Sequence, residues 1–503
     1  MKPDNLQSYF HQFRKQCIGI NQTFLTPYGE KKIHYFDWTA SGRLYKPIED
    51  KLTKKFGPFV GNTHSESSET GVDMTLSYHI AQSIIRKHIN ASKNDTLLLT
   101  GTGTSAAILK LQRILGLKVS DQMQRMHKFT KLKSTNTFIK QEKPVIFITH
   151  MEHHSNQITW EECDVDLVIV PPDINGNFST ENLKRELKKY ENRKVKIGSF
   201  TACSNVTGIL NPVHTLAKIM HSNGGYCFID FAAAAPYISI DMHPNRKDEY
   251  FDAIFFSVHK FLGGPGTPGI LVFNNKLYPK KVSPDQPGGG TVLWTNPWGG
   301  RQYYDDISLR EDGGTPGFLQ TIKAALAIKL KEEMNVEKIL KREAFLTDRL
   351  LKGLRDIQGI RILDDNQMHR LGIISFIHEE IHFNLLVKLL NDRYGIQTRG
   401  GCSCAGTYGH CLFHLNKEQS KKITDRINLG DQSTKPGWIR ASLHPILTLE
   451  EIDLLISAIR EIGVHYKKWE KDYTYNSKTN EFEHKQWTLK KQNNKIEMWF
   501  EAT

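Results

Sequence analysis

Seven short apolar segments between residues 95 and 273 constrain this chain more than any other feature. They are almost continuously apolar, which is typical of strands buried on both faces of a mostly parallel sheet. Amphipathic stretches lie between them, at 106–115, 180–190 and 213–221. Alternating strands and helices predict an α/β fold with a mostly parallel seven-stranded sheet flanked by helices. The predicted strands are Thr96–Leu99, Val145–Thr149, Val165–Val170, Val195–Phe200, Tyr226–Asp230, Ala253–Phe256 and Gly269–Phe273.

The pattern changes after Thr315. Long helical patterns cover Phe318–Met334 and Glu337–Leu354, and a smaller α+β unit then ends with a helix over Leu449–Tyr466. Lys118–Lys143 and Thr407–Gly437 are polar, rich in turn residues and poorly periodic, so we expect surface insertions there.

These patterns predict four parts of the chain. A large domain is expected over residues 35–340, and a small α+β domain over 341–470. Residues 1–34 form an N-terminal segment that we expect to pack on the small domain, and residues 471–503 form a C-terminal extension.

Composition narrows the functional classes. The net charge of +13 over 503 residues comes from scattered lysines without a recognised nucleic-acid motif, so a basic surface is expected rather than nucleic-acid binding. The first residues lack the apolar segment of a secretory signal, and no run of eighteen apolar residues would cross a membrane. Seven cysteines, an odd number, favour free thiols or metal ligands in a reducing compartment, which we expect to be the cytoplasm.

A glycine-rich turn, Thr100–Ala106, directly follows the first predicted strand and opens a helix. Glycines allow close backbone approach, and a helix N-terminus offers free N–H groups to a phosphate. The spacing also matches a dinucleotide-binding pattern, but no acidic residue follows at the distance that a ribose requires. A phosphate cradle is the favoured interpretation, and a purely structural helix start is the alternative.

Two later predicted strands end in residues whose side chains can bind ligands or react. Asp230 closes one strand, at the sheet edge where such folds bind ligands; alternatively it caps the next turn. The following strand ends in Ser257, His259 and Lys260 before a Gly/Pro-rich turn. A lysine held there can form an imine, and the serine and histidine can bind a phosphate, although most loop lysines are merely solvated.

Several segments, in order along the chain, resemble the class V aminotransferase family, and within it the group II cysteine desulfurases and selenocysteine lyases. Beside the glycine-rich turn and the lysine segment, they are Tyr35–Ser41, Met151–Asn156, Ser204–Gly208, Asp312–Pro316, Thr398–Gly406 and Gly437–Ser442. The resemblance implies a homodimer of the pyridoxal 5′-phosphate (PLP) fold type I, acting on a small amino acid.

The resemblance also implies residue roles. Lys260 would carry PLP as a Schiff base, Asp230 would hold the pyridine nitrogen protonated and His153 would stack on the ring. Asn205 would lie near cofactor and substrate, Arg440 would bind the substrate carboxylate and Arg399 would assist nearby. The residues implied as phosphate ligands are Gly103, Thr104, Ser257, His259 and, in the neighbouring subunit's site, Thr315.

Cys404 aligns with the desulfurase nucleophile, which takes sulfur from cysteine and passes it to an acceptor protein. Cys402 and Ser403 replace two histidines of that family, Ala233 replaces a glutamine, and an insertion separates Cys404 from Arg440. Transamination or another elimination with Cys404 incidental therefore stays open. Cys402 is interpreted as a small buried residue, with a resolving or second acceptor thiol as the alternative.

Two further alternatives depend on other features. Cys402, Cys404, His410, Cys411 and His414 have zinc-ligand chemistry, but their spacing matches no closed zinc module, so no metal is expected. A non-catalytic basic scaffold on the same fold is the remaining possibility.

Overall fold

The computed structural model describes residues 3–63, 67–118, 143–367, 369–487 and 496–501. The predicted insertion at Lys118–Lys143 lies, except for its two ends, outside the described residues.

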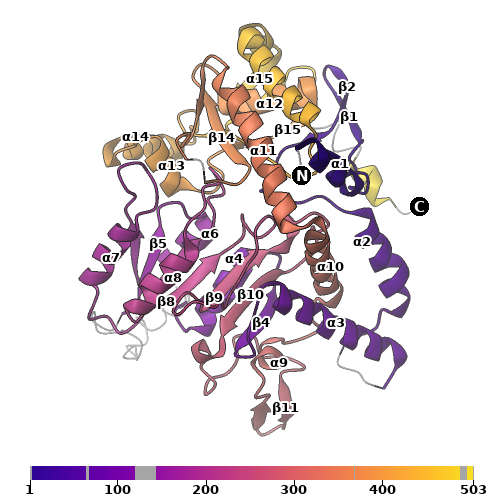
Figure 1. The fold of residues 1–503 in the computed structure, drawn as a ribbon, viewed down its shortest axis with the longest axis vertical. Coiled ribbons are helices and arrows are strands. Elements are labelled where there is room, and N and C mark those ends of the chain that lie inside the picture. Colours follow the sequence, from indigo (N-terminus) through magenta and orange to yellow (C-terminus); the bar gives the residue numbers. More distant parts are fainter. Residues whose placement is uncertain (1–2, 64–66, 119–142, 368, 488–495, 502–503) are drawn as a thin grey trace.

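A seven-stranded sheet forms the lower part of the molecule in Figure 1. Its strands, in spatial order, are β4 (Asp95–Thr100), β10 (Gly269–Asn274), β9 (Ala253–Ser257), β8 (Tyr226–Asp230), β7 (Lys196–Thr201), β5 (Val145–Thr149) and β6 (Asp166–Val170). β10 runs antiparallel to β4 and β9, and the other pairs of neighbours are parallel. All seven predicted strands are confirmed within one residue at either end, and so is the α/β fold class.

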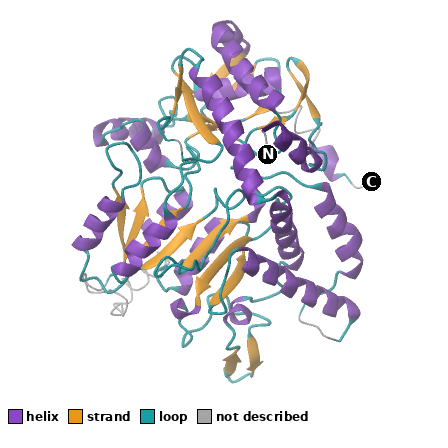
Figure 2. Cartoon of the chain, viewed as in Figure 1, coloured by secondary structure: helices purple, strands orange, loops and turns teal. Residues whose placement is uncertain are grey.

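Successive side chains of the strands enter two different cores, as a strand's period of two requires. In β5, Ile146 and Ile148 pack with α4 (Thr104–Ile114) and α6 (His154–Glu161), whereas Val145 and Phe147 pack on the opposite face. That face is covered by α7 (Thr180–Lys189), α8 (Val213–Ser222) and α10 (Phe318–Met334). Helices therefore enclose both faces of the sheet (Figure 2).

A second, antiparallel sheet lies in the upper part of Figure 1. Its strand order is β13 (Ile360–Ile362), β14 (Ile373–His378), β17 (Trp438–Ser442) and β16 (Arg399–Gly401). Its associated helices are α11 (Val336–Arg355), α12 (Phe383–Tyr394) and α15 (Leu449–Trp469). The division into domains at residues 340 and 470 stays a prediction.

The N-terminal residues lie against this upper part. Helix α1 (Pro3–Arg14) contacts α11, and β3 (His34–Tyr35) pairs in parallel with β15 (Ile396–Gln397). The other N-terminal elements are β1 (Thr23–Thr26), β2 (Gly29–Lys32), α2 (Lys46–Lys51) and α3 (Glu69–His88).

The predicted surface insertion at Thr407–Gly437 contains two helices that its poor periodicity did not predict. Helix α13 (Gly406–Leu412) buries Tyr408, whereas α14 (Lys417–Asn428) buries none of its residues. A capping box between Asn416 and Gln419 starts α14 and was a sequence signal for it. The remaining short elements are β11 (Val292–Thr295), β12 (Arg301–Tyr303), α9 (Ile307–Glu311), β18 (Tyr473–Asn476) and β19 (Glu481–His484).

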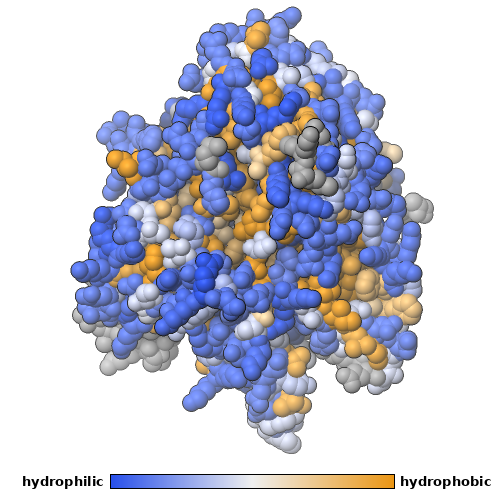
Figure 3. Space-filling view, viewed as in Figure 1, coloured by the Kyte–Doolittle hydropathy of each residue, from blue (hydrophilic) through white to orange (hydrophobic). Residues whose placement is uncertain are grey.

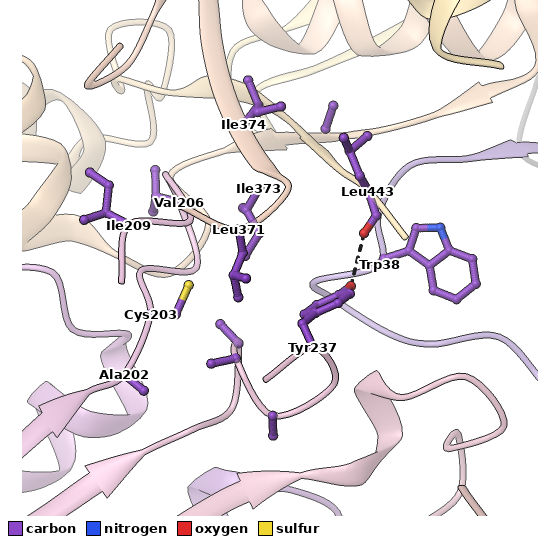
Figure 4. Packing of buried hydrophobic residues seen from close by; sticks show 14 of the residues in the cluster. Trp38, Ala202, Cys203, Val206, Ile209, Tyr237, Leu371, Ile373, Ile374 and Leu443 are labelled. Atoms are coloured by element: carbon purple, nitrogen blue, oxygen red, sulfur yellow. Dashed lines mark hydrogen bonds between the residues drawn. The ribbon is translucent and has the colours of Figure 1, made fainter. Parts of the chain in front are cut away.

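Apolar side chains join the two sheets (Figure 4). Val206 and Cys203, from the loop after β7, face Leu371 and Ile373, which lead into β14. The Tyr237 hydroxyl donates to the Leu443 carbonyl at 3.1 Å across the same junction. The loops that follow the large sheet are therefore fixed by the second sheet.

The face seen in Figure 3 is mostly hydrophilic, but apolar side chains gather over α3 at its lower right. Leu76 and Ile80, one helical turn apart on α3, are 54% and 60% exposed.

All seven cysteines are free thiols, as predicted. Among the described residues, no helix has the length and apolar character needed to cross a membrane.

Arg14 of α1 and Glu451 of α15 form a buried bidentate ion pair, with N–O distances of 2.8 and 2.9 Å. Burial alone would raise the pKa of Glu451, but His34, Arg14 and the helix cap outweigh it and lower that pKa to about 2. The Glu451 carboxylate therefore binds a proton less tightly in the folded protein than in the unfolded chain. The stability that the ionised carboxylate contributes is present above its unfolded pKa of 4.5 and disappears as the pH falls towards 2.

We therefore expect Glu451→Gln to reduce the free energy of unfolding at pH 7 by about 3 kcal/mol, measured by denaturant unfolding. The loss should shrink between pH 4.5 and 2. Glu470→Gln, at an exposed position directly after α15, is the matched control. An equal loss at all pH values would contradict this origin of the stability.

Candidate active site

A cavity of about 320 Å³ opens where β7, β8 and β9 end. Parallel pairing aligns these ends, and the helix start of α4 joins them from one side. Eleven of the twelve residues predicted for the site line this one cavity. They are Gly103, Thr104, His153, Asn205, Asp230, Ser257, His259, Lys260, Arg399, Cys404 and Arg440.

The start of α4 and the end of β9 form a polar cradle at one end of the cavity. The Ser257 hydroxyl accepts from the Thr104 backbone N–H at 2.8 Å and lies 2.6 Å from the Thr104 hydroxyl. A Cβ on Gly103 would lie 3.0 Å from both His259 Cε1 and Ser257 Oγ, so glycine relieves a tight approach here. N–H groups at a helix N-terminus together with hydroxyls suit a phosphate.

Asp230 and Lys260 carry opposite charges into the cavity from neighbouring strands. Asp230 is 3% exposed, and its Oδ1 accepts from the Ala232 N–H at 2.8 Å. Burial raises the pKa of Asp230 to about 6, although the Lys260 ammonium opposes that shift. Burial lowers the pKa of Lys260 to about 8, and the Asp230 carboxylate opposes it. Among the described residues, the Lys260 amine has no hydrogen-bond partner, so it is available to a ligand.

His153 is held as a neutral ring. Its Nδ1 accepts from the Ser155 N–H at 3.1 Å, which leaves Nε2 to carry the proton. Burial, followed by the nearby Lys260 ammonium, lowers the pKa of His153 to about 3. A neutral imidazole in this wall can stack on an aromatic ring without adding charge.

Glu152, immediately before His153, joins three elements behind the cavity. It is fully buried and accepts from the Thr149 N–H and hydroxyl, the Thr201 N–H at 2.8 Å and the Asn156 amide at 2.8 Å. Burial raises the pKa of Glu152 to about 8 against these donors. The sequence alone did not point to Glu152 as a site residue, because its role depends on contacts between strands.

Arg440 and Arg399 form the cationic end of the cavity, and Asp37 pairs with both. Asp37 Oδ1 lies 2.8 Å from Arg440 Nη2, and Asp37 Oδ2 lies 3.7 Å from Arg399 Nη1. Arg440 is 3% exposed, so its charge requires this partner. Asp37 was not predicted as a site residue, although it lies within the segment Tyr35–Ser41 that carried the resemblance.

Two buried polar atoms in the wall, Arg440 Nε and Asn205 Oδ1, find no hydrogen-bond partner among the described residues. Unpaired buried donors and acceptors are costly, so each indicates a place for a polar ligand group. Arg440 offers the open N–H to a carboxylate, and Asn205 offers an acceptor.

Cys404 lies exposed at the mouth of the same cavity, on the loop between β16 and α13. Cys402 is partly buried and packs against the main core, and its interpretation as a small core residue stays a prediction. The His410 ring nitrogens are within hydrogen-bond distance of the Gly406 carbonyl and the Ser420 hydroxyl. In the described part of the chain, no group of three or more His, Cys, Asp or Glu side chains could hold a metal ion.

Thr315 is the one predicted site residue that the structure does not bring into this cavity. It is exposed, between α9 and α10, and is absent from the lining of its own subunit's cavity.

The cavity fits the PLP that the sequence predicted. The cradle at Gly103, Thr104 and Ser257 suits the phosphate, and the carboxylate of Asp230 suits a protonated ring nitrogen. The unpartnered Lys260 amine suits the aldehyde. The residues present therefore match the cofactor's chemically distinct groups.

The protein-family model for class V aminotransferases matches residues 131–455. A probable cysteine desulfurase of Staphylococcus aureus is 27% identical over 435 residues, which cover 86% of this chain and 92% of that protein. A probable cysteine desulfurase of Pyrococcus abyssi is 24% identical over 86% of this chain and 94% of its own.

Solved structures show the same fold. A cysteine desulfurase of Thermococcus onnurineus has a TM-score of 0.70 at 21% identity, covering 90% of this chain and 97% of that one. One of Escherichia coli has a TM-score of 0.67 at 20% identity, covering 92% and 98%. The sheet order, the cavity and the family match lead to one conclusion: this chain belongs to the class V aminotransferases, enzymes that use pyridoxal phosphate.

Proposed function

We propose that this enzyme is a cysteine desulfurase: it converts L-cysteine to L-alanine and retains the sulfur as a persulfide on Cys404. The observation that carries the proposal is the exposed Cys404 thiol at the mouth of the cavity that also contains Lys260 and Arg440. Relatives named as probable cysteine desulfurases over most of the chain support it. The reaction balances, because the cysteine sulfur becomes the outer atom of the persulfide and alanine takes a proton at Cβ.

The chain's residues have separate tasks in this proposal. Bound PLP would withdraw electrons from the substrate's Cα, which makes the Cα proton acidic. Lys260 would hold the cofactor and move that proton with its amine, whose lowered pKa of about 8 favours exchange near neutral pH. Arg440 would bind the α-carboxylate with its open Nε–H, and Cys404 Sγ would accept the sulfur.

The remaining wall residues would orient the cofactor. Asp230 would face the ring nitrogen, and a protonated nitrogen would keep this carboxylate ionised despite its burial. The neutral ring of His153 would stack on the pyridine, and Asn205 Oδ1 would accept from cofactor or substrate. A sulfur-acceptor protein would then take the persulfide sulfur from the exposed Cys404.

Lys260→Ala is expected to abolish covalent attachment of PLP while the protein stays folded. Borohydride treatment followed by peptide mass spectrometry should find reduced cofactor on residue 260 in the wild type and none in the variant. Lys188→Ala, an exposed lysine on α7, should behave as wild type. A reduced adduct that persists in Lys260→Ala would refute the assignment, and a wild type without bound cofactor would favour a scaffold.

Cys404→Ser is expected to lower alanine and sulfide release from L-cysteine by at least about a hundredfold, because serine cannot take up sulfur. Cys402→Ser and the distant Cys163→Ser should retain release within about threefold. Persulfide labelling of the wild type should locate the extra sulfur on residue 404. Undiminished alanine release by Cys404→Ser would favour transamination or another elimination with this thiol incidental.

A homodimer with shared sites completes the proposal. The exposed apolar residues Leu76 and Ile80 on α3 suit a protein interface, and Thr315 is exposed near α10 rather than in its own cavity. We expect a dimeric mass in solution and about tenfold weaker PLP binding by Thr315→Ala, measured by cofactor titration. Thr474→Ala on exposed β18 is the control. Unchanged PLP binding by Thr315→Ala would contradict the shared site.

A further inference from the structure

The loop that carries Cys404 has an unfavourable backbone conformation. Ser403 and Cys404 are consecutive non-glycine residues with φ of +51° and +55°. Residues other than glycine rarely adopt this left-handed backbone conformation, and they keep it only where surrounding contacts enforce it. The contacts that hold this loop therefore decide where the thiol lies.

Ser403 is fixed from two sides. Its carbonyl accepts from the Asn205 amide at 2.7 Å, and its hydroxyl accepts from the Trp438 indole N–H at 3.2 Å. Neither bond reaches Cys404 or the residues after it.

His154 fixes the other half of the loop through two reciprocal hydrogen bonds. Its backbone N–H donates to the Cys404 carbonyl at 2.8 Å, and its Nε2 accepts from the Gly406 N–H at 2.9 Å. Both N–H groups lie in the first turn of a helix, α6 and α13, where no intrahelical acceptor exists. The ring also packs against Gly406, since a Cβ there would lie 3.2 Å from His154 Nε2.

We propose that His154 is a positioning residue for the Cys404 thiol: its neutral ring, by accepting the Gly406 N–H, keeps Cys404 in the left-handed conformation at the mouth of the cavity. The inference rests on the proposed function for its catalytic consequence, but the structural part stands by itself. His153, the residue before it, lines the cavity. Two consecutive histidines therefore serve the site: His153 forms part of its wall, and His154 holds the loop that carries the thiol.

The bond requires an unprotonated Nε2. The groups that face His154 are Glu161 on α6, Lys435 in the loop before β17 and the neighbouring His153 ring. Burial, with help from Lys435, lowers the pKa of His154. The ring is therefore neutral at pH 7, and protonation at lower pH would remove the acceptor and release the Gly406 N–H.

Hydrogen–deuterium exchange tests the loop without reference to activity. His154→Leu should accelerate exchange of the Gly406 amide by about tenfold at pH 7, whereas His154→Gln, which keeps an acceptor oxygen, should restore part of the protection. His465→Leu, an exposed histidine on α15, is the matched control. In the wild type, corrected exchange at Gly406 should also accelerate as the pH is lowered from about 7, and in His154→Gln it should not.

Kinetics test the consequence for the thiol. His154→Leu should lower kcat for alanine release by about tenfold with KM for L-cysteine and the cofactor's absorbance unchanged, and His154→Gln should recover part of kcat. Unaltered exchange at Gly406 in His154→Leu would overturn the inference whatever the activity. Faster exchange with no loss of kcat would refute the positioning role. If the wild type releases no alanine but the exchange results hold, the proposed function fails and the loop assignment survives.

Discussion

The parallel pairing of β8 with β9 is the constraint on which the site depends. Asp230 lies opposite Phe255, so the strand that ends in Asp230 and the strand that leads to Ser257 and Lys260 end at the same edge. Both strands are almost fully buried between two helix-covered faces, so a shift of register would disrupt the packing of their side chains on both faces. The hydrophobic packing that fixes the register thus also brings the Asp230 carboxyl and the Lys260 amine to one edge of the sheet, although neither charged group contributes to that packing.

Charge compensation explains much of the remaining wall. A buried guanidinium is tolerated because Asp37 lies beside Arg440, and the Asn205 carbonyl accepts a second N–H at 3.0 Å. These partners leave Arg440 Nε open. The Arg440 charge is therefore compensated within the protein, and its Nε–H is left free to bind an anion. Glu152 is likewise satisfied by four donors. The neighbouring His153 stays uncharged because it is buried close to the Lys260 ammonium.

The sequence predicted those features that depend on local pattern. Buried strands are visible as apolar runs, and Asp230, Ser257 and Lys260 were recognisable because each directly follows such a run. Asp37 and His154 act through residues that are remote in sequence, so no periodicity or spacing pointed to their partners. Helix α14 was missed because it is stabilised by capping and local ion pairs rather than by an apolar face, and α13, with seven residues, is too short to show a helical period. Thr315 is a different case: only the resemblance named it, and it does not line the cavity of its own subunit.

The pairing of Asp37 with Arg440 joins residues 403 positions apart, whereas the cradle and Lys260 lie within the middle of the chain. During synthesis the cradle and Lys260 are therefore made well before β17, whose Ser442 pairs with Asp37 and whose Arg440 binds the Asp37 carboxylate. A nascent chain could thus hold its cofactor before it can select an amino acid. Selectivity for substrate would be the last property that this protein acquires as it folds.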